Sequence, residues 1–438
     1  MALPIALASC ATYQPSPLPL DAGLARPSLA DAANLAPMAH PRLAAASMDT
    51  NKPLDEFDLA RLALLLSPDL AAERSKSGVA QAQLFAAGLL PDPQLSLSRD
   101  VPYASGLATA LAGGLGFDLR SLFARPAQKD SSRHALTKVR NDLAWSEWLA
   151  INHVRTLCRR IVFLERQAAI AGQATDAARK IYDLSAGNLR RGDARLDATT
   201  LYQIGFLDAQ DRSLALKRNL AAARQQLNAA IGLSPDTVLP LAEPPPVKDA
   251  DGLDASRLTQ TALRQRFDLQ ALREGYSSQE ANLRHALRSS IPLPQLSLNR
   301  ARDTSAVWTR GIGIGIDLPL WNRGRGDIQI AAATRSQLAA EYAARVYQTQ
   351  GDIAGACTDL LAIDTQRKAL ADEIPRLIQA TDTIGKAAQS GDLPLLAYET
   401  IRATLLDKQL ALSALEQAQL EGEVALETLV GDRIGSSP

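Results

Sequence analysis

The sequence predicts a mainly α-helical protein that has a small β part and is built from two copies of one unit. Three observations lead to this prediction. The composition is rich in Ala, Leu, Gln and Arg but only 4% aromatic, which is typical of long helices and unusual for a compact core. Residues 127–234 contain no proline. Short motifs recur along the chain at one constant spacing, the mark of an internal repeat.

The constant spacing of the motifs is 199 residues. Residues 114–119 match residues 313–318, and Gly192 and its following aspartate match Gly391 and its aspartate. Because separate blocks share one spacing, the chain is best explained as an internal duplication. The predicted organisation is an incomplete lipoprotein signal at 1–9, an extended N-terminal arm at 10–55, a first repeat at 56–232, a proline-rich linker at 233–256, a second repeat at 257–432 and a tail at 433–438.

Each repeat shows the same order of predicted elements before its long helix. A first helix is expected at about 56–88 and again at 257–288, and a strand of alternating leucine and polar residues follows it. A second strand is clearest at 311–318, where bulky apolar residues alternate with glycine. This alternation continues as a strand and opens no helix, so we exclude a dinucleotide-binding loop.

Very long helices follow the strands. A helix at 127–187 would be about 90 Å long, and the second repeat is expected to begin its own at Asp327 and to bend at Pro375. Gly192 and Gly391 are expected to end these helices at hairpin tips, where the turn needs a positive φ or a close approach of the backbone. A seven-residue repeat of small apolar residues predicts a coiled-coil seam. It comprises Leu143, Ala150, Leu157, Leu164, Ala171 and Ala178, interleaved with Val154, Ile161 and Ala168.

Residue types that carry chemistry are sparse. The four histidines are scattered and the three cysteines lack metal-type spacing, so we expect no metal site and no cofactor. No Ser/His/Asp set, paired-carboxylate site or phosphate loop is evident, which argues against an enzyme. Basic and acidic residues are equal at 47 each, which argues against nucleic-acid binding. Cys158 and Cys357 are 199 residues apart, on equivalent but separate helices, so we interpret both as small buried residues rather than a disulfide.

The strands are interpreted as membrane strands. No stretch approaches twenty consecutive apolar residues, as a transmembrane helix would require. Four strands cannot close a barrel, and an open edge in lipid leaves backbone groups unpaired, so two, three or four copies would have to pool eight, twelve or sixteen strands. A soluble sheet capping a helical bundle is the alternative, but nothing in the sequence would cover its second face. Aromatic residues near the strand ends favour a membrane interface: Tyr103, Phe117, Trp308 and Trp321.

The duplicated unit resembles the outer-membrane efflux protein (TolC-like) family over about residues 56–432. The most specific segment is 315–328, where strand gives way to long helix, and its Leu-Pro-Leu-Trp-Asn-Arg sequence is similar to the cation and heavy-metal efflux branch. The resemblance implies a homotrimeric α-helical barrel topped by a 12-stranded transmembrane β-barrel. It also implies a passive exit duct for cations, heavy metals or drugs, with a periplasmic membrane-fusion adaptor and an RND-type inner-membrane pump as partners.

The same resemblance assigns roles to residues at the hairpin tips. Gly192, Leu196, Gly391 and Leu395 match the positions at which the family docks its adaptor. Some family members close the periplasmic mouth with aspartates after the second tip. Those positions here hold Ala397 and Thr400, and the nearby candidate mouth acids are Asp392 and Glu399.

The first residues resemble a bacterial lipobox that ends at Cys10. Lipidation of Cys10 would anchor the chain in the lipid of the bacterial outer membrane, and Ala11 resembles the residue of lipoproteins sorted there. The apolar stretch before Cys10 is short and has no preceding Lys or Arg, so the signal is incomplete as written.

Two further functions stay open at this point. A non-conducting helical scaffold could bridge the layers of the envelope. A periplasmic adaptor is disfavoured, because such proteins carry one hairpin flanked by lipoyl-like β segments and two hairpins are predicted here. The substrate is not determined by the sequence, since a wide duct leaves selection mostly to the pump.

Overall fold

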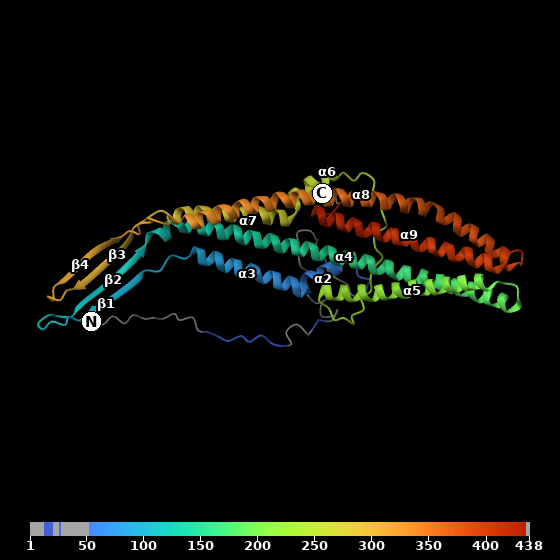
Figure 1. The fold of residues 1–438 in the computed structure, drawn as a ribbon, viewed down its shortest axis with the longest axis horizontal. Helices are drawn as coiled ribbons and strands as arrows, with labels where there is room; N and C mark the ends of the chain where they lie inside the picture. Colours follow the sequence, from blue (N-terminus) through green and yellow to red (C-terminus); the bar gives the residue numbers. More distant parts are fainter. Residues whose placement is uncertain (1–12, 21–25, 28–51, 435–438) are drawn as a thin grey trace.

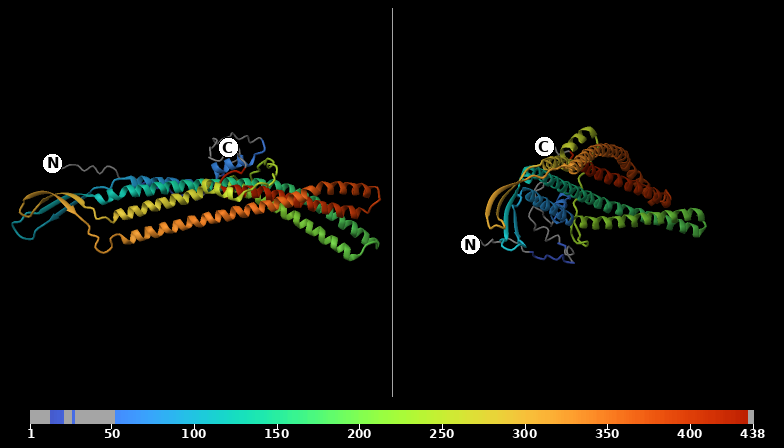
Figure 2. Two further views of the ribbon diagram at one scale, coloured as in Figure 1. Left: turned by 90° about the horizontal axis from the view of Figure 1, so that it is seen from above. Right: turned by 60° about the vertical axis from the view of Figure 1, so that its left-hand side comes forward.

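The computed structural model describes residues 13–20, 26–27 and 52–434. These residues form a long, slender molecule with strands at one end and two helical hairpins at the other (Figures 1 and 2). Cys10, the predicted signal at 1–9 and most of the predicted arm at 10–55 lie outside the described residues.

Two very long helices run from the strands to the opposite end of the molecule. Helix α4 (Leu119–Arg191) has 73 residues and α8 (Arg325–Gln389) has 65, which makes α4 about 110 Å long at 1.5 Å per residue. Each turns back into a shorter antiparallel helix, α5 (Leu196–Ile231) or α9 (Leu395–Val430). The predicted hairpins are confirmed, and α8 runs on through Pro375.

Helix α4 begins eight residues earlier than the sequence predicts. The Asp118 side chain accepts hydrogen bonds from the backbone N–H groups of Arg120 (2.9 Å) and Ser121 (3.3 Å), which caps the first turn. The cap therefore fixes the start upstream of Pro126, which lies inside the helix. The prediction that the helix begins after this proline was wrong.

The first helix of each repeat is broken into two, contrary to the prediction of single helices. The first repeat has α2 (Glu56–Leu66) and α3 (Pro68–Gly88), and the second has α6 (Ala255–Gln265) and α7 (Phe267–Ser289). Pro68 occupies the first position of its helix, where its missing N–H costs nothing.

A glycine from the end of each repeat packs against each break. A Cβ added at Gly232 would lie 2.5 Å from the carbonyl oxygen of Leu66, and one added at Gly431 would lie 3.1 Å from Cα of Arg266. Both distances are shorter than normal contacts, and both glycines have positive φ, so a side chain is excluded at either position. The duplication thus extends to the packing in the middle of the molecule. This region, where Gly232 meets Leu66 and Gly431 meets Arg266, is called the equator below.

Four antiparallel strands form one sheet in the order β1-β2-β3-β4. They are β1 (Gln94–Asp100), β2 (Ala110–Asp118), β3 (Gln295–Arg302) and β4 (Trp308–Gly315). The β2–β3 ladder joins the two repeats, so neither repeat forms its sheet alone. Within the described residues, the outer edges of β1 and β4 have no partner strand.

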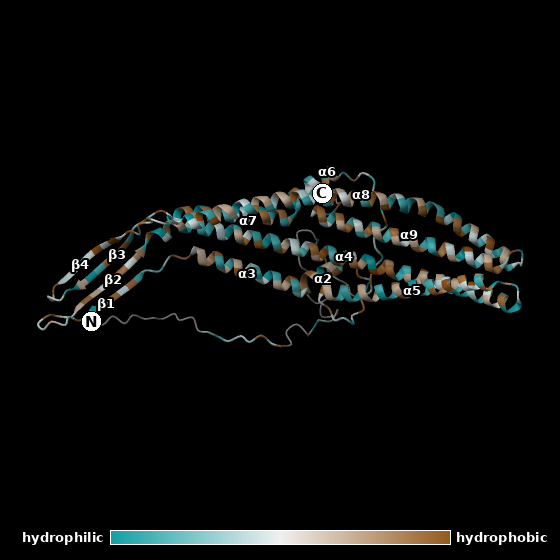
Figure 3. Ribbon diagram, in the orientation of Figure 1, coloured by the Kyte–Doolittle hydropathy of each residue, from teal (hydrophilic) through white to brown (hydrophobic). Residues whose placement is uncertain are grey.

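The two faces of the sheet differ in polarity, and both are bare. Leu95, Leu115, Leu298 and Ile312 pair across the strands on one face, and serine, asparagine and glycine occupy the other. In this single chain Ile312 is 76% exposed, and no helix of the described residues packs across either face (Figure 3). The predicted period-two alternation is confirmed, but β4 begins and ends three residues earlier than the predicted strand at 311–318.

The largest apolar cluster lies at the equator and packs α2 against α4 and α5. Trp148, Ile151 and Ile161 of α4 are 1% exposed, and Ile231 of α5 is fully buried. The middle of the predicted seam lies here, because Val154, Leu157, Ile161 and Leu164 belong to this cluster. The seam residues Leu143, Ala168 and Ala178 are only partly buried. A smaller cluster joins α6, α8 and α9 in the second repeat.

Helix α4 is an inner helix of the molecule, whereas α8 is an outer one. Helix α4 contacts α3 and α5 on one side and α7 and α9 on the other. Among the described elements, helix α8 makes its main contacts with α6, α7 and α9, so one of its flanks is largely open. Among the helices described, none combines the length and apolar character needed to cross a membrane.

Candidate functional site

The two hairpin tips form the first candidate site. They lie at the same end of the molecule, opposite the sheet (Figure 1). Gly192 has φ = 83° and Gly391 has φ = 86°. A Cβ added at either glycine would find no neighbouring atom within 4 Å, so the backbone conformation rather than crowding requires glycine. The predicted positive φ at both tips is confirmed.

One hydrogen-bond pattern closes both tips. In the first, the N–H of Asp193 donates to the carbonyl of Asn188 at 2.9 Å. In the second, the N–H of Asp392 donates to the carbonyl of Ala387, also at 2.9 Å. This bond back over five residues belongs to the Schellman motif, which satisfies helix carbonyls that would otherwise lack a partner. The two tips therefore share the same backbone turn at their glycines.

The leucines assigned to docking lie at the start of the returning helices. Leu196 of α5 is 69% exposed and Leu395 of α9 is 47% exposed. An exposed apolar side chain beside a rigid turn is suited to packing against a partner. Their role in docking stays a prediction. A shallow depression around the first of them is lined by Arg195, Leu196, Asp197, Thr200 and Leu201.

The two candidate mouth acids lie in different surroundings. Asp392 is exposed in the turn and accepts a hydrogen bond from Oγ of Ser390 at 2.5 Å. Glu399 is only 4% exposed and pairs with Lys180 of α4 at 3.6 Å and with Arg402 at 3.4 Å. Glu399 thus connects the second hairpin to the first, and only Asp392 is free to face solvent. A role in gating stays a prediction for both.

A buried ion cluster at the equator was missed by the sequence reasoning. The Glu56 carboxylate accepts hydrogen bonds from Arg155 at 3.0 Å and from Arg159 at 2.6 and 2.9 Å. Arg155 also donates to Glu427 of α9 at 2.5 Å. Both arginine side chains are at most 5% exposed. The cluster therefore fixes α2, α4 and α9 to one another where the repeats meet.

Neighbouring charges and burial shift the pKa values of the carboxyl groups of this cluster in opposite directions. Burial alone would raise the pKa of Glu56, but its hydrogen bonds and charge interactions with Arg159 and Arg155 prevail and hold the pKa below its ordinary value. Burial raises the pKa of the neighbouring Glu423, and Arg159 offsets this only in part. The missed sequence signal was a pair of arginines four residues apart on the apolar seam of α4.

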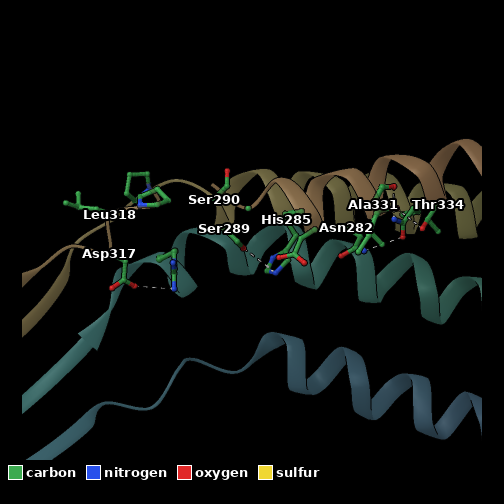
Figure 4. A pocket seen from close by; sticks show the side chains of 16 residues that line it. Asn282, His285, Ser289, Ser290, Asp317, Leu318, Ala331 and Thr334 are labelled. Carbon is green, nitrogen blue, oxygen red and sulfur yellow. Dashed lines mark hydrogen bonds and ion pairs between the residues drawn. The ribbon is translucent and has the colours of Figure 1, made fainter. Parts of the chain in front are cut away.

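A second candidate site is the joint between sheet and helices, where a pocket of about 560 Å³ lies. Asn282, His285 and Ser289 of α7 line it opposite Ala331 and Thr334 of α8 (Figure 4).

An ion pair and a close glycine hold the connection from β4 to α8 against this joint. Asp317 lies 3.7 Å from Arg120 at the start of α4. Gly324 has φ = 66°, and a Cβ added there would lie 2.9 Å from Cβ of Ser290. The family-like segment at 318–323 therefore runs over the end of α7 before α8 begins.

The described residues contain no group of three or more His, Cys, Asp or Glu side chains placed to hold a metal ion. Cys158 and Cys357 are free thiols, both buried, in the equatorial clusters of the first and second repeat respectively. Burial raises the pKa of the Cys158 thiol far above its ordinary value, so it is unreactive.

Residues 258–432 match the outer membrane efflux protein family. No curated protein sequence matches the chain significantly. Several solved channel structures have the same fold. CusC has a TM-score of 0.68 at 19% identity, with 91% of this chain and 99% of CusC covered. The outer-membrane channel OprN has a TM-score of 0.70 at 15% identity, covering 96% of this chain and 99% of OprN.

The outer membrane channel CmeC of Campylobacter jejuni gives a TM-score of 0.68 at 16% identity, covering 94% of this chain and 96% of CmeC. At these identities the likeness shows the fold. The family match covers the second repeat, and the shared fold covers nearly the whole chain.

Proposed function

We propose that three copies of this chain form an efflux channel in the outer membrane, with their twelve strands pooled into a β-barrel and their helices into a periplasmic duct. The observation that carries the proposal is the sheet, which exposes one apolar face and one polar face and has two edges without a partner strand among the described residues. A closed barrel pairs both edges, places the apolar face in lipid and leaves the small polar face to the water-filled bore.

The helices support the same mode of assembly. Helix α8 exposes Ile330 (68%) and Tyr347 (80%), and at the opposite edge α3 exposes Phe85 (71%). These two edges lie on the same sides of the molecule as the free strands β4 and β1 (Figure 1). A head-to-tail contact between unlike edges generates a closed ring when the rotation from one copy to the next closes after a whole number of copies.

The channel acts as a passive duct within a tripartite system. A periplasmic membrane-fusion adaptor would bind the hairpin tips, and an RND-type inner-membrane pump would supply the energy. The similarity of residues 318–323 to the cation and heavy-metal branch favours that class of substrate, with drugs as the alternative. Lipidated Cys10 would anchor each copy in the outer membrane.

Light scattering of the detergent-solubilised protein tests the assembly. We expect a homotrimer, because only pooled strands satisfy the free edges. A monodisperse monomer that stays soluble without detergent would exclude both barrel and channel. For the anchor, fatty-acid labelling should mark the wild type and not Cys10→Ser; an unlabelled wild type that retains residues 1–9 would exclude lipidation.

The double variant Leu196→Asp/Leu395→Asp tests docking at the tips. If the tips bind the adaptor, the trimer should form normally while adaptor cross-linking and efflux are both lost. If the leucines only stabilise the hairpins, the variant should lose thermal stability yet keep its cross-links. Normal efflux by the double variant would refute a docking role.

A further inference from the structure

Three exposed arginines surround the turn of the first hairpin tip: Arg190, Arg191 and Arg195. The two tips share one backbone, closed by the same hydrogen bonds. Their chemistry nevertheless differs, because the equivalent positions of the second tip, 199 residues further on, hold neutral residues. These are Gln389, Ser390 and Pro394.

The charge difference extends along the helices next to the turns. Residues 179–197 contain five cationic and three acidic side chains, whereas the equivalent residues 378–396 contain one cationic and two acidic side chains. The first tip is therefore net positive and the second net negative. The duplicated backbone makes this a difference in side chains alone.

The arginines of the first tip are only weakly neutralised within the chain. Arg191 lies 3.5 Å from Asp193 and donates a hydrogen bond to Oδ1 of Asn188. Arg195 donates two hydrogen bonds to Asp197 at 2.9 and 3.1 Å. The two arginine side chains are nevertheless 66% and 85% exposed. Arg190 has no ion-pair partner among the residues that the structure describes. Exposed ion pairs contribute little free energy, so these guanidinium groups can exchange their partners at low cost.

An apolar surface lies directly beside these arginines. Leu196 and Leu201 are 69% and 68% exposed and share one shallow depression with Arg195. An apolar centre with charged side chains around it is the usual anatomy of a protein-binding surface. Guanidinium groups are also well suited to bidentate binding of carboxylates.

We propose that the first tip binds an acidic surface on the helical hairpin of the adaptor, while the second tip binds a neutral, apolar one. The proposal rests on the proposed function and adds to it the chemistry of the partner. Complementary charge fixes register and excludes wrong partners more than it raises affinity. The asymmetry would therefore direct each adaptor surface to one of two tips whose backbones are the same.

Two synthetic antiparallel helical hairpins of equal length serve as probes, one with glutamates flanking its turn and the other with glutamines. Their binding to the full-length trimer in detergent is measured by fluorescence anisotropy at about 50 mM and about 300 mM salt, which brackets the range over which exposed charges become screened. We expect the glutamate hairpin to bind about tenfold more tightly at low salt, and the preference to shrink at high salt. The triple variant Arg190→Gln/Arg191→Gln/Arg195→Gln should abolish the preference.

The matched control removes two cations from the second hairpin. Arg376→Gln/Lys386→Gln should keep the full preference for the glutamate hairpin. Equal binding of both probes to the wild type, or an unchanged preference in the triple variant, would overturn the proposal.

Two other outcomes would show that the arginines bind a partner other than the adaptor, and they would also overturn the proposal. Loss of the trimer in the triple variant would show that they hold neighbouring copies together. Tighter binding to phosphatidylglycerol vesicles than to the glutamate hairpin would identify a lipid surface. The proposed function fails separately, if the wild-type trimer never conducts ions in a planar bilayer, even when adaptor and pump are added.

Discussion

Helices α4 and α8 are products of one duplication, yet they lie in different environments. Trp148 of α4 is 1% exposed, whereas Tyr347, the equivalent residue of α8, is 80% exposed. Arg155 and Arg159 of α4 belong to a buried ion cluster, and the same positions in α8 hold Ala354 and Thr358. The difference arises because, among the described elements, α4 packs against helices on both flanks and α8 mainly on one.

This difference teaches how a duplicated chain can form a closed ring. The inner helix has acquired a large buried side chain and a buried charge cluster, because its neighbours belong to the same chain. The outer helix keeps an open flank with exposed apolar residues, which another copy would cover. The flank of α8 is therefore expected to contribute to assembly rather than to the folding of one copy.

The largest effect is expected from truncating the equivalent aromatic residues. Trp148→Ala should lower the free energy of unfolding by about 3 to 5 kcal/mol, because it leaves a cavity in the equatorial core. Tyr347→Ala should change it by less than about 0.5 kcal/mol, as is usual for exposed positions, but should weaken the trimer. Chemical denaturation of each variant in detergent and light scattering measure the two quantities. Equal destabilisation by both variants would contradict the contrast between inner and outer helix.

The next effect concerns the charge cluster that only α4 carries. Glu56→Gln leaves two buried arginines without their shared carboxylate, so we expect a loss of about 3 kcal/mol at pH 7. The folded-state pKa of Glu56 is lowered, so its contribution is present above its ordinary pKa and is lost as the pH falls through the lower folded value. Melting temperatures at falling pH should therefore converge for variant and wild type. A difference that stays constant down to pH values well below the ordinary pKa would contradict this account. Glu421→Gln, whose partner Arg160 is 39% exposed, is the control and should cost about 1 kcal/mol or less.

The smallest expected effect concerns the two hairpin tips, where the two repeats should behave alike. Gly192→Ala and Gly391→Ala should each cost about 1 to 2 kcal/mol, because both place a Cβ at positive φ without any clash. Gly172→Ala, inside α4 and equally unobstructed, should instead stabilise the protein by about 0.5 to 1 kcal/mol. Thermal unfolding of the three variants measures the effects. Unequal costs at the two tips would show that their backbones differ.

The features with a local signal could be predicted from the sequence. The strands follow from their period-two alternation, and the tips from Gly192 and Gly391. The break at Pro68 had a local signal that was overlooked, since proline favours the first position of a helix. The break at Arg266 has none, because it depends on contact with Gly431 more than 160 residues away. Nor could the pairing of Glu56 with Arg155 be foreseen, since 99 residues separate them.

Planar-bilayer recording of the purified protein tests the central claim most directly. Trimers with closed barrels should give discrete steps of ion conductance, since a pooled barrel leaves a continuous water-filled bore. Monomers isolated from the same preparation should give none, because four strands cannot close. Stable trimers that insert into the bilayer yet never conduct, even when adaptor and pump are added, would contradict the channel and favour the non-conducting envelope scaffold.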